Sequence, residues 1–167
     1  MKAQELHNVI NIMQAKINDI IGKRTRGVHF GGQRELFAAI SSIEELYDLS
    51  YVKEVEEKRP LIMNIMINAM LEEQTTRQII QSLKLKGLDD ENAEKVAITE
   101  ESRIKNLASW YQYYGAGYKF FSVEFREDAC EECKKAYKDD KKYPLEQLDM
   151  LPPLHGECNC DLMFHRK

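Results

Sequence analysis

Cysteine is absent from the first 129 residues of this 167-residue chain. Tryptophan and proline are also scarce, with one and four residues, and aromatic residues make up only 9% of the sequence. No segment is rich in glycine or proline, which excludes a collagen-like or low-complexity chain. Hydrophobic residues make up 43% of the sequence, a fraction that excludes intrinsic disorder. The length predicts one domain, or one helical region with a small additional module.

Charge and hydropathy exclude further classes of protein. The chain has 24 Lys and Arg against 28 Asp and Glu, a net charge of −4, which argues against nucleic-acid binding over the whole surface. The longest apolar run, residues 61–71, is interrupted by Asn64 and Asn68, so no membrane span is predicted. The first eight residues lack the apolar core of a signal peptide. We therefore expect a protein that is neither secreted nor bound to a membrane.

Four segments have apolar residues at the spacing of amphipathic helices. The predicted helices span residues 3–21, 34–49, 61–85 and 99–114. Gly22 is expected to end the first helix and Gly87 the third. Residues 89–92 are expected to form a polar junction before the fourth helix, which Thr99 opens. In this interpretation Glu100 is a charge near the helix N-terminus, where it complements the helix dipole.

The hydrophobic period changes after Gly117. Between residues 118 and 126, Phe121, Val123 and Phe125 alternate with polar side chains, which predicts a half-buried strand. Residues 143–145 are predicted to form a short return strand. The predicted fold is therefore mainly α, with about four helices in a helical body (residues 1–117) and a small β module (residues 118–167).

All four cysteines lie in this C-terminal module. They read as a Cys130-x₂-Cys133 pair followed, 22 residues after Cys133, by His155-x₂-Cys158-x-Cys160. A disulfide framework suits a small secreted domain, whereas this spacing is typical of a metal site. Thiolates and a neutral imidazole are the ligands of tetrahedral zinc. The sequence therefore predicts one structural Zn²⁺ ion, so the full prediction is a helical body with a zinc-stapled β module.

Five candidate ligands compete for four positions around the ion. Our interpretation favours Cys130, Cys133 and His155 with one further thiol, and it places Cys158 ahead of Cys160 without separating them. In a site of four cysteines, His155 would instead lie outside the ligand shell. Because four protein ligands leave no position open for water, a structural role is expected rather than a catalytic one.

The C-terminal module resembles a known family. The run FFSVEFREDACEECKKAY, followed by YPL and then LPPLHGECNCDL, is similar to the C-terminal module of phage head morphogenesis proteins, the Mu-F-like minor capsid family. The resemblance covers residues 96–162. The positions that match the family pattern are Asp128, Cys130, Cys133, Pro152, Pro153, His155, Cys158 and Cys160. The resemblance implies a minor structural or assembly protein, located in the host cytoplasm or the virion, that binds capsid or portal proteins or its own copies.

Two features bear on the other function classes. The family's helix usually opens with Ala-Arg-Thr-Glu, and this chain has Ile98 in place of the arginine. Some relatives are suspected of ADP-ribosyltransferase ancestry, which needs that arginine and a catalytic glutamate, so we predict no enzyme and no small-molecule substrate. The basic loop from Lys23 to Arg34 is the feature that favours the alternative, a zinc-dependent regulator that contacts nucleic acid weakly. His165 is expected to be exposed in a frayed terminus.

Overall fold

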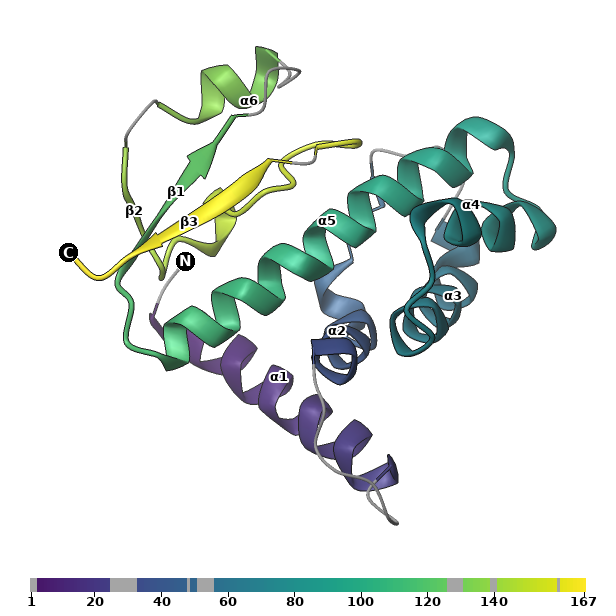
Figure 1. The fold of residues 1–167 in the computed structure, drawn as a ribbon, viewed down its shortest axis with the longest axis horizontal. Helices are drawn as coiled ribbons and strands as arrows, with labels where there is room; N and C mark the ends of the chain where they lie inside the picture. Colours follow the sequence, from purple (N-terminus) through teal and green to yellow (C-terminus); the bar gives the residue numbers. More distant parts are fainter. Residues whose placement is uncertain are drawn as a thin grey trace.

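The chain folds into a helical part and a small antiparallel sheet that lie on opposite sides of one long helix (Figure 1). A computed structural model describes residues 3–24, 33–47, 49–50, 56–125, 131–138, 141–158 and 160–167. Its helices are α1 (Ala3–Arg24), α2 (Gln33–Ser41), α3 (Arg59–Leu71), α4 (Thr76–Leu85), α5 (Asp90–Gly115) and α6 (Glu131–Ala136). Its strands are β1 (Phe120–Glu124), β2 (Tyr143–Pro144) and β3 (Asp161–His165). The predicted class, mainly α with a small β portion, is confirmed.

Helix α5 is the central element of the fold. It packs against α2 and α4 on the helical side and against β3 on the other. The indole Nε1 of Trp110, a fully buried side chain of α5, donates a hydrogen bond of 2.8 Å to the carbonyl oxygen of Leu145 just after β2. One cluster of buried apolar side chains extends from Met13 in α1 to Cys160 before β3. The helices and the sheet therefore share a continuous core, which α5 joins.

The sheet has the strand order β2-β1-β3, with both pairs antiparallel. The predicted alternation of β1 is confirmed, because Phe121 and Val123 are buried while Glu124 is exposed. The predicted return strand is β2, where Tyr143 pairs with Phe121. In the longer pairing of β1 with β3, Glu124 lies opposite Asp161. The chain segments that follow β1 and precede β3 therefore leave the sheet at the same end.

The single helix predicted for residues 61–85 is wrong, because α3 and α4 are separate. Glu73 between them has a φ of 53°, a left-handed conformation that interrupts the helix. Thr75 then caps α4: its Oγ1 accepts from the backbone N of Gln78, and the side-chain oxygen of Gln78 accepts from the backbone N of Thr75 at 2.8 Å. This reciprocal capping box is a helix start signal that the apolar spacing concealed.

Two other helix ends differ from the prediction, and one agrees with it. Helix α1 continues past Gly22 to Arg24. Helix α2 ends at Ser41, where the hydroxyl groups of Ser41 and Ser42 donate to the carbonyl oxygens of Phe37 and Ala39, each at 2.7 Å. Such side-chain bonds to the backbone favour a helix end. The predicted ending near Gly87 is confirmed, since α4 closes at Leu85 and Gly87 has a φ of 93°.

The fourth helix begins earlier than predicted. The Asp89 carboxylate accepts a hydrogen bond of 2.8 Å from the backbone N of Asn92 and so caps α5. The predicted polar junction is therefore the first turn of α5. As a result, Glu100 lies well inside the helix, with a fully buried side chain, and its interpretation as an N-terminal charge is wrong.

The residues after the last cysteine also differ from the prediction. His165 is partly buried in β3, and its Nε2 lies 2.8 Å from the Ser122 hydroxyl of β1. The expectation of an exposed, frayed terminus is wrong because backbone pairing with β1 orders this segment. Among the described residues, none of the helices combines the length and apolar character needed to cross a membrane.

Candidate metal centre

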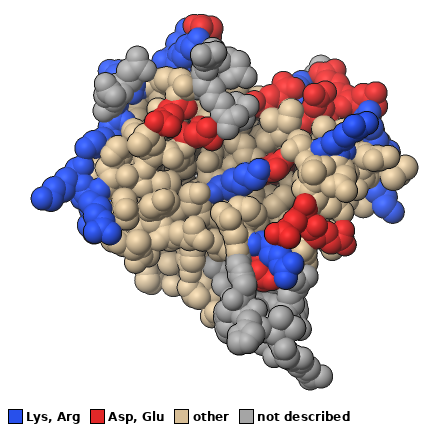
Figure 2. Space-filling view, viewed as in Figure 1, with Lys and Arg blue, Asp and Glu red and all other residues tan. Residues whose placement is uncertain are grey.

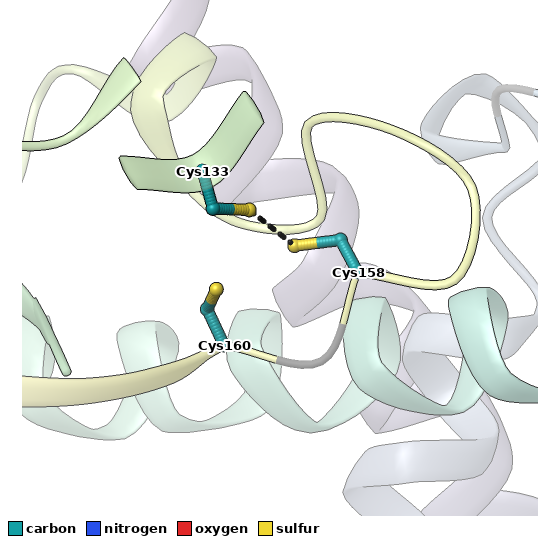
Figure 3. Close-up of side chains that lie close together, drawn as sticks. All are labelled: Cys133, Cys158 and Cys160. Atoms are coloured by element: carbon teal, nitrogen blue, oxygen red, sulfur yellow. Dashed lines mark hydrogen bonds between the residues drawn. The ribbon is translucent and has the colours of Figure 1, made fainter. Parts of the chain in front are cut away.

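Three of the predicted ligands meet at one end of the sheet. Cys133 lies in α6, just after β1, whereas Cys158 and Cys160 lie in the segment that leads into β3. Because β1 and β3 pair along their full length, the two segments reach the same end of the sheet from opposite directions. Figure 3 shows the three side chains with their sulfur atoms directed toward a common centre.

The three thiols form a buried and closely spaced group. Their Sγ atoms all lie within 4.8 Å of one another, and the Sγ atoms of Cys133 and Cys158 are 3.4 Å apart. The exposed fractions of Cys133, Cys158 and Cys160 are 1, 2 and 4%. A tetrahedral site with metal–sulfur bonds of about 2.3 Å places its sulfurs about 3.8 Å apart. The spacing therefore fits three thiolates that share one metal ion.

His155 lies beside this group and presents one ring nitrogen to it. Its Nε2 is 3.2 Å from the Sγ of Cys133, and its Nδ1 is 2.7 Å from the carbonyl oxygen of Gly156. A carbonyl oxygen only accepts hydrogen bonds, so in the neutral imidazole Nδ1 is the donor and the lone pair of Nε2 faces the Cys133 sulfur. A histidine that ligates a metal through Nε2 commonly donates from Nδ1 to such a backbone oxygen.

The fifth candidate, Cys130, lies outside the described residues, as does Asp128 of the family pattern. The described residues therefore bring together three thiols that can share one ion, and His155 lies beside Cys133 but outside the group whose ligand atoms all lie within 4.8 Å of one another. Most of the loop between Lys23 and Arg34 also lies outside the described residues. At its end, Arg34 forms an exposed ion pair of 3.0 Å with Glu35.

Two polar side chains of α5 hold the segment that carries the second group of ligands. The Nδ2 of Asn106 donates to the carbonyl oxygens of Pro152 at 3.1 Å and Cys160 at 3.3 Å. About two helical turns before Asn106, the Thr99 hydroxyl accepts a hydrogen bond of 2.7 Å from the backbone N of Glu157. Both ends and the middle of segment 152–160 are thus bonded to α5. Thr99 was predicted only to open a helix and Asn106 was not singled out, because both bond to residues 46 to 58 positions further along the chain.

Aromatic rings close the other side of the thiol group. Tyr137 is 1% exposed, and its ring contacts the rings of Phe125 and Tyr143 at centroid distances of 6.5 and 5.9 Å. Burial raises the pKa of the Tyr137 phenol well above its ordinary value, and negative charge on Cys158 and Cys133 raises it further. The surroundings therefore exclude water, and the charge of a bare thiolate group would be costly there without a cation.

A second buried polar group lies on α5, formed by Glu100, Arg103 and Tyr47. The Arg103 Nε donates to Glu100 Oε2 at 2.5 Å, and the guanidinium carbon lies 4.3 Å from the centroid of the Tyr47 ring. The Tyr47 hydroxyl donates to the carbonyl oxygen of Ser41 at 2.9 Å. This arrangement joins α5 to the segment after α2, and it engages Glu100 and Arg103 with each other rather than with solvent.

Comparison with known proteins does not assign a family or a function to this geometry. No family model, curated protein or solved structure matches the chain. What the structure establishes is a buried group of three cysteines that can hold a metal ion, beside a histidine and supported by α5.

Proposed function

We propose that this protein is a structural or assembly component of a phage or prophage head, and that it acts by binding other head proteins. The resemblance of residues 96–162 to the Mu-F-like minor capsid family motivates the proposal. One structural observation supports it: residues of both halves of the family pattern, Cys133 from the first and His155 and Cys158 from the second, lie in contact. A coincidental match to a sequence pattern would not require its two halves to meet.

The proposal assigns one Zn²⁺ ion to the centre, held by Cys133, Cys158, Cys160 and the Nε2 of His155. When bound, the ion supplies a cross-link between α6 and the segment before β3. Thiolate and imidazole donors favour zinc over oxygen-preferring ions such as magnesium. A shell of four protein ligands leaves no open position for a substrate, which fits a structural role.

The alternative of a divergent ADP-ribosyltransferase is less well supported. Its catalytic glutamate would be Glu100, whose side chain is 0% exposed and forms an ion pair with Arg103. A glutamate that acts on a substrate has to reach it. We therefore propose a binding protein and not an enzyme.

Co-purification tests the proposal directly. The zinc-loaded, affinity-tagged full chain would be mixed with the portal and major coat proteins of the same phage or prophage, and purified heads would be examined for the chain. We expect one of the two proteins to be retained and the chain to be present in heads.

The Cys158→Ser variant and chelated wild-type protein provide the comparison, and both are expected to bind less because the centre is lost. Absence of the chain from heads, together with no binding to either protein, would overturn the proposal. Release of nicotinamide from NAD by the purified chain would overturn it in favour of the enzyme.

A further inference from the structure

Four basic side chains gather at the end of the sheet where β1 begins and β3 ends. Lys119 precedes β1, and Arg166 and Lys167 follow β3. Lys142 enters the antiparallel β2 from the opposite direction, since Tyr143 pairs with Phe121, and its side chain reaches back to Lys167. The backbone N of Lys119 donates to the carbonyl oxygen of His165 at 3.0 Å, and the Lys142 Nζ donates to that of Lys167 at 2.7 Å. We call Lys119, Lys142, Arg166 and Lys167 the basic patch. All four are exposed.

In the described part of the chain, what distinguishes the basic patch is that four cations without an acidic partner gather in one place, whereas exposed cations such as Arg77 and Lys86 also lack such a partner but lie elsewhere. Among the described residues, no Asp or Glu forms an ion pair with any of its four members. Elsewhere on the surface, Lys84, Lys95 and Lys105 each pair with an acid within 2.9 Å. Lys141 is also exposed, but its neighbours Asp139 and Asp140 lie outside the described residues, so it is not counted in the patch.

Charge is therefore segregated on a chain whose net charge is −4. In Figure 2, Lys and Arg gather at the left, where Figure 1 places the C-terminus, and Asp and Glu gather at the upper right, near the start of α5. The acidic end includes Asp89, Asp90 and Glu91. A local surplus of unpaired cations on an acidic protein attracts a polyanion at that end alone.

The aromatic rings beside the patch are already occupied. The Arg166 guanidinium carbon lies 4.9 Å from the centroid of the Tyr118 ring. The Tyr113 ring contacts the rings of Tyr118 and Phe164 at 4.8 and 4.3 Å. These contacts leave the rings engaged with one another and with Arg166, whereas binding of single strands relies on free ring faces for base stacking. The patch offers charge and hydrogen-bond donors, which match phosphate oxygens.

We propose that the basic patch binds the phosphate backbone of double-stranded nucleic acid without reading its bases. A duplex presents one negative charge per about 1.7 Å of its axis, so several phosphates can face the patch at once. The Lys142 ammonium keeps further donors after its bond to Lys167, and the stacked Arg166 keeps its guanidinium N–H groups at the surface. This inference does not depend on the metal centre or on a role in head assembly.

Fluorescence anisotropy with a labelled 25-base-pair DNA duplex of arbitrary sequence tests the proposal, with the zinc-loaded full chain. If the four cations of the patch neutralise four phosphates, the affinity of the protein for the duplex is expected to fall about 100-fold between 50 and 200 mM salt. A second duplex of different sequence is expected to bind equally well. The variant Lys119→Glu/Arg166→Glu is expected to lose at least about 10-fold in affinity at 50 mM salt and to have a shallower salt dependence.

The matched control is Arg77→Glu/Lys86→Glu, which changes the net charge equally at exposed positions of α4 and the turn after it. It is expected to bind like the wild type. Equal losses in the two variants, or salt-independent binding, would overturn the proposal. So would binding only to anionic phospholipid vesicles, or a salt-sensitive dimer that pairs the patch with the acidic end of a second copy in place of DNA.

Discussion

The side-chain amide of Asn106, in the middle of α5, donates a hydrogen bond to the backbone carbonyl of Cys160, 54 residues further along the chain. The same Nδ2 also donates to Pro152, so one buried amide holds both ends of the segment that contains His155 and Cys158. The cysteines of the candidate metal centre are consequently positioned by the long helix and not by the sheet alone.

Replacing Asn106 with alanine is expected to destabilise the fold by about 1–3 kcal/mol, because two buried carbonyl oxygens lose their donor. Zinc affinity is expected to fall about 10-fold or more, since segment 152–160 is held less firmly. Urea denaturation and competition with a chelator measure the two effects. Asn64→Ala, at an exposed position of α3, is the control and is expected to change neither. Equal effects of the two substitutions would contradict the assigned role of Asn106.

Protein purified without added metal is expected to contain one zinc ion per chain by elemental analysis. Removal of the ion is expected to unfold the C-terminal residues, because the energy of metal binding is then lost from folding. Cys133→Ser and Cys158→Ser are expected to lose the ion together with the part of the circular-dichroism signal that comes from the C-terminal residues. Complete folding of metal-free protein would refute the structural role of the ion.

His155→Ala and Cys130→Ser identify the fourth ligand. The 3.2 Å approach of His155 Nε2 to the Cys133 sulfur predicts that the histidine variant binds zinc far more weakly. The Cys130 variant is expected to retain an ion. X-ray absorption spectroscopy provides a second measurement, with three sulfurs and one nitrogen expected around the zinc. A shell of four sulfurs would show that Cys130 is the ligand in place of His155.

Loss of either charge from the buried ion pair of Glu100 and Arg103 is expected to lower folding stability strongly, and loss of both charges is expected to lower it by less than the two single losses combined. Glu100→Gln and Arg103→Met are each expected to cost about 3 kcal/mol of folding stability, since each removes one charge of a buried ion pair. The double variant is expected to recover part of this loss. The exposed pair of Glu91 and Lys95 is the control, and Glu91→Gln is expected to leave the denaturation midpoint unchanged. Additive losses in the double variant would show that the pair does not act as a unit.

Burial raises the pKa of Tyr47 above its ordinary value of 10, with smaller opposing and reinforcing effects from Arg103 and Glu100. A phenol that resists ionisation in the folded state makes its full contribution to stability below pH 10. That contribution is lost as the pH rises above 10, because the unfolded chain releases the proton and the folded chain retains it. Denaturation of Tyr47→Phe between pH 9 and 12 is expected to show a weaker alkaline loss of stability than the wild type. An identical pH dependence would mean that Tyr47 is not the group responsible.

Local patterns in the chain were sufficient for some of these features. The alternation of Phe121 and Val123 identified β1, since a half-buried strand imposes a period of two on its own residues. The cysteine spacing indicated a metal site because ligands two or three positions apart converge through a single turn. The split between α3 and α4 was also encoded locally, in Thr75 and Gln78, but apolar spacing on either side concealed it.

Other features depended on residues that are distant in the chain. Strand β3 has no clear alternation and exists because β1 offers it a complete set of backbone partners. Asn106 looked like an ordinary polar residue of a helix until packing brought Pro152 and Cys160 to it. The basic patch assembles only when the pairing of β1 with β3 brings Lys119 beside Arg166 and the Lys142 side chain reaches Lys167.

The amino-acid pattern alone was thus enough to assign the helical class, the β1 strand and the concentration of candidate metal ligands in the last 38 positions. Packing settled the rest: which thiols meet, which helix supports them, and where unpaired positive charge collects. The physical reason is the distance along the chain over which each kind of interaction acts. Periodicity and ligand spacing record interactions within a few residues, whereas a contact across 54 residues, such as that of Asn106 with Cys160, depends on how whole elements pack.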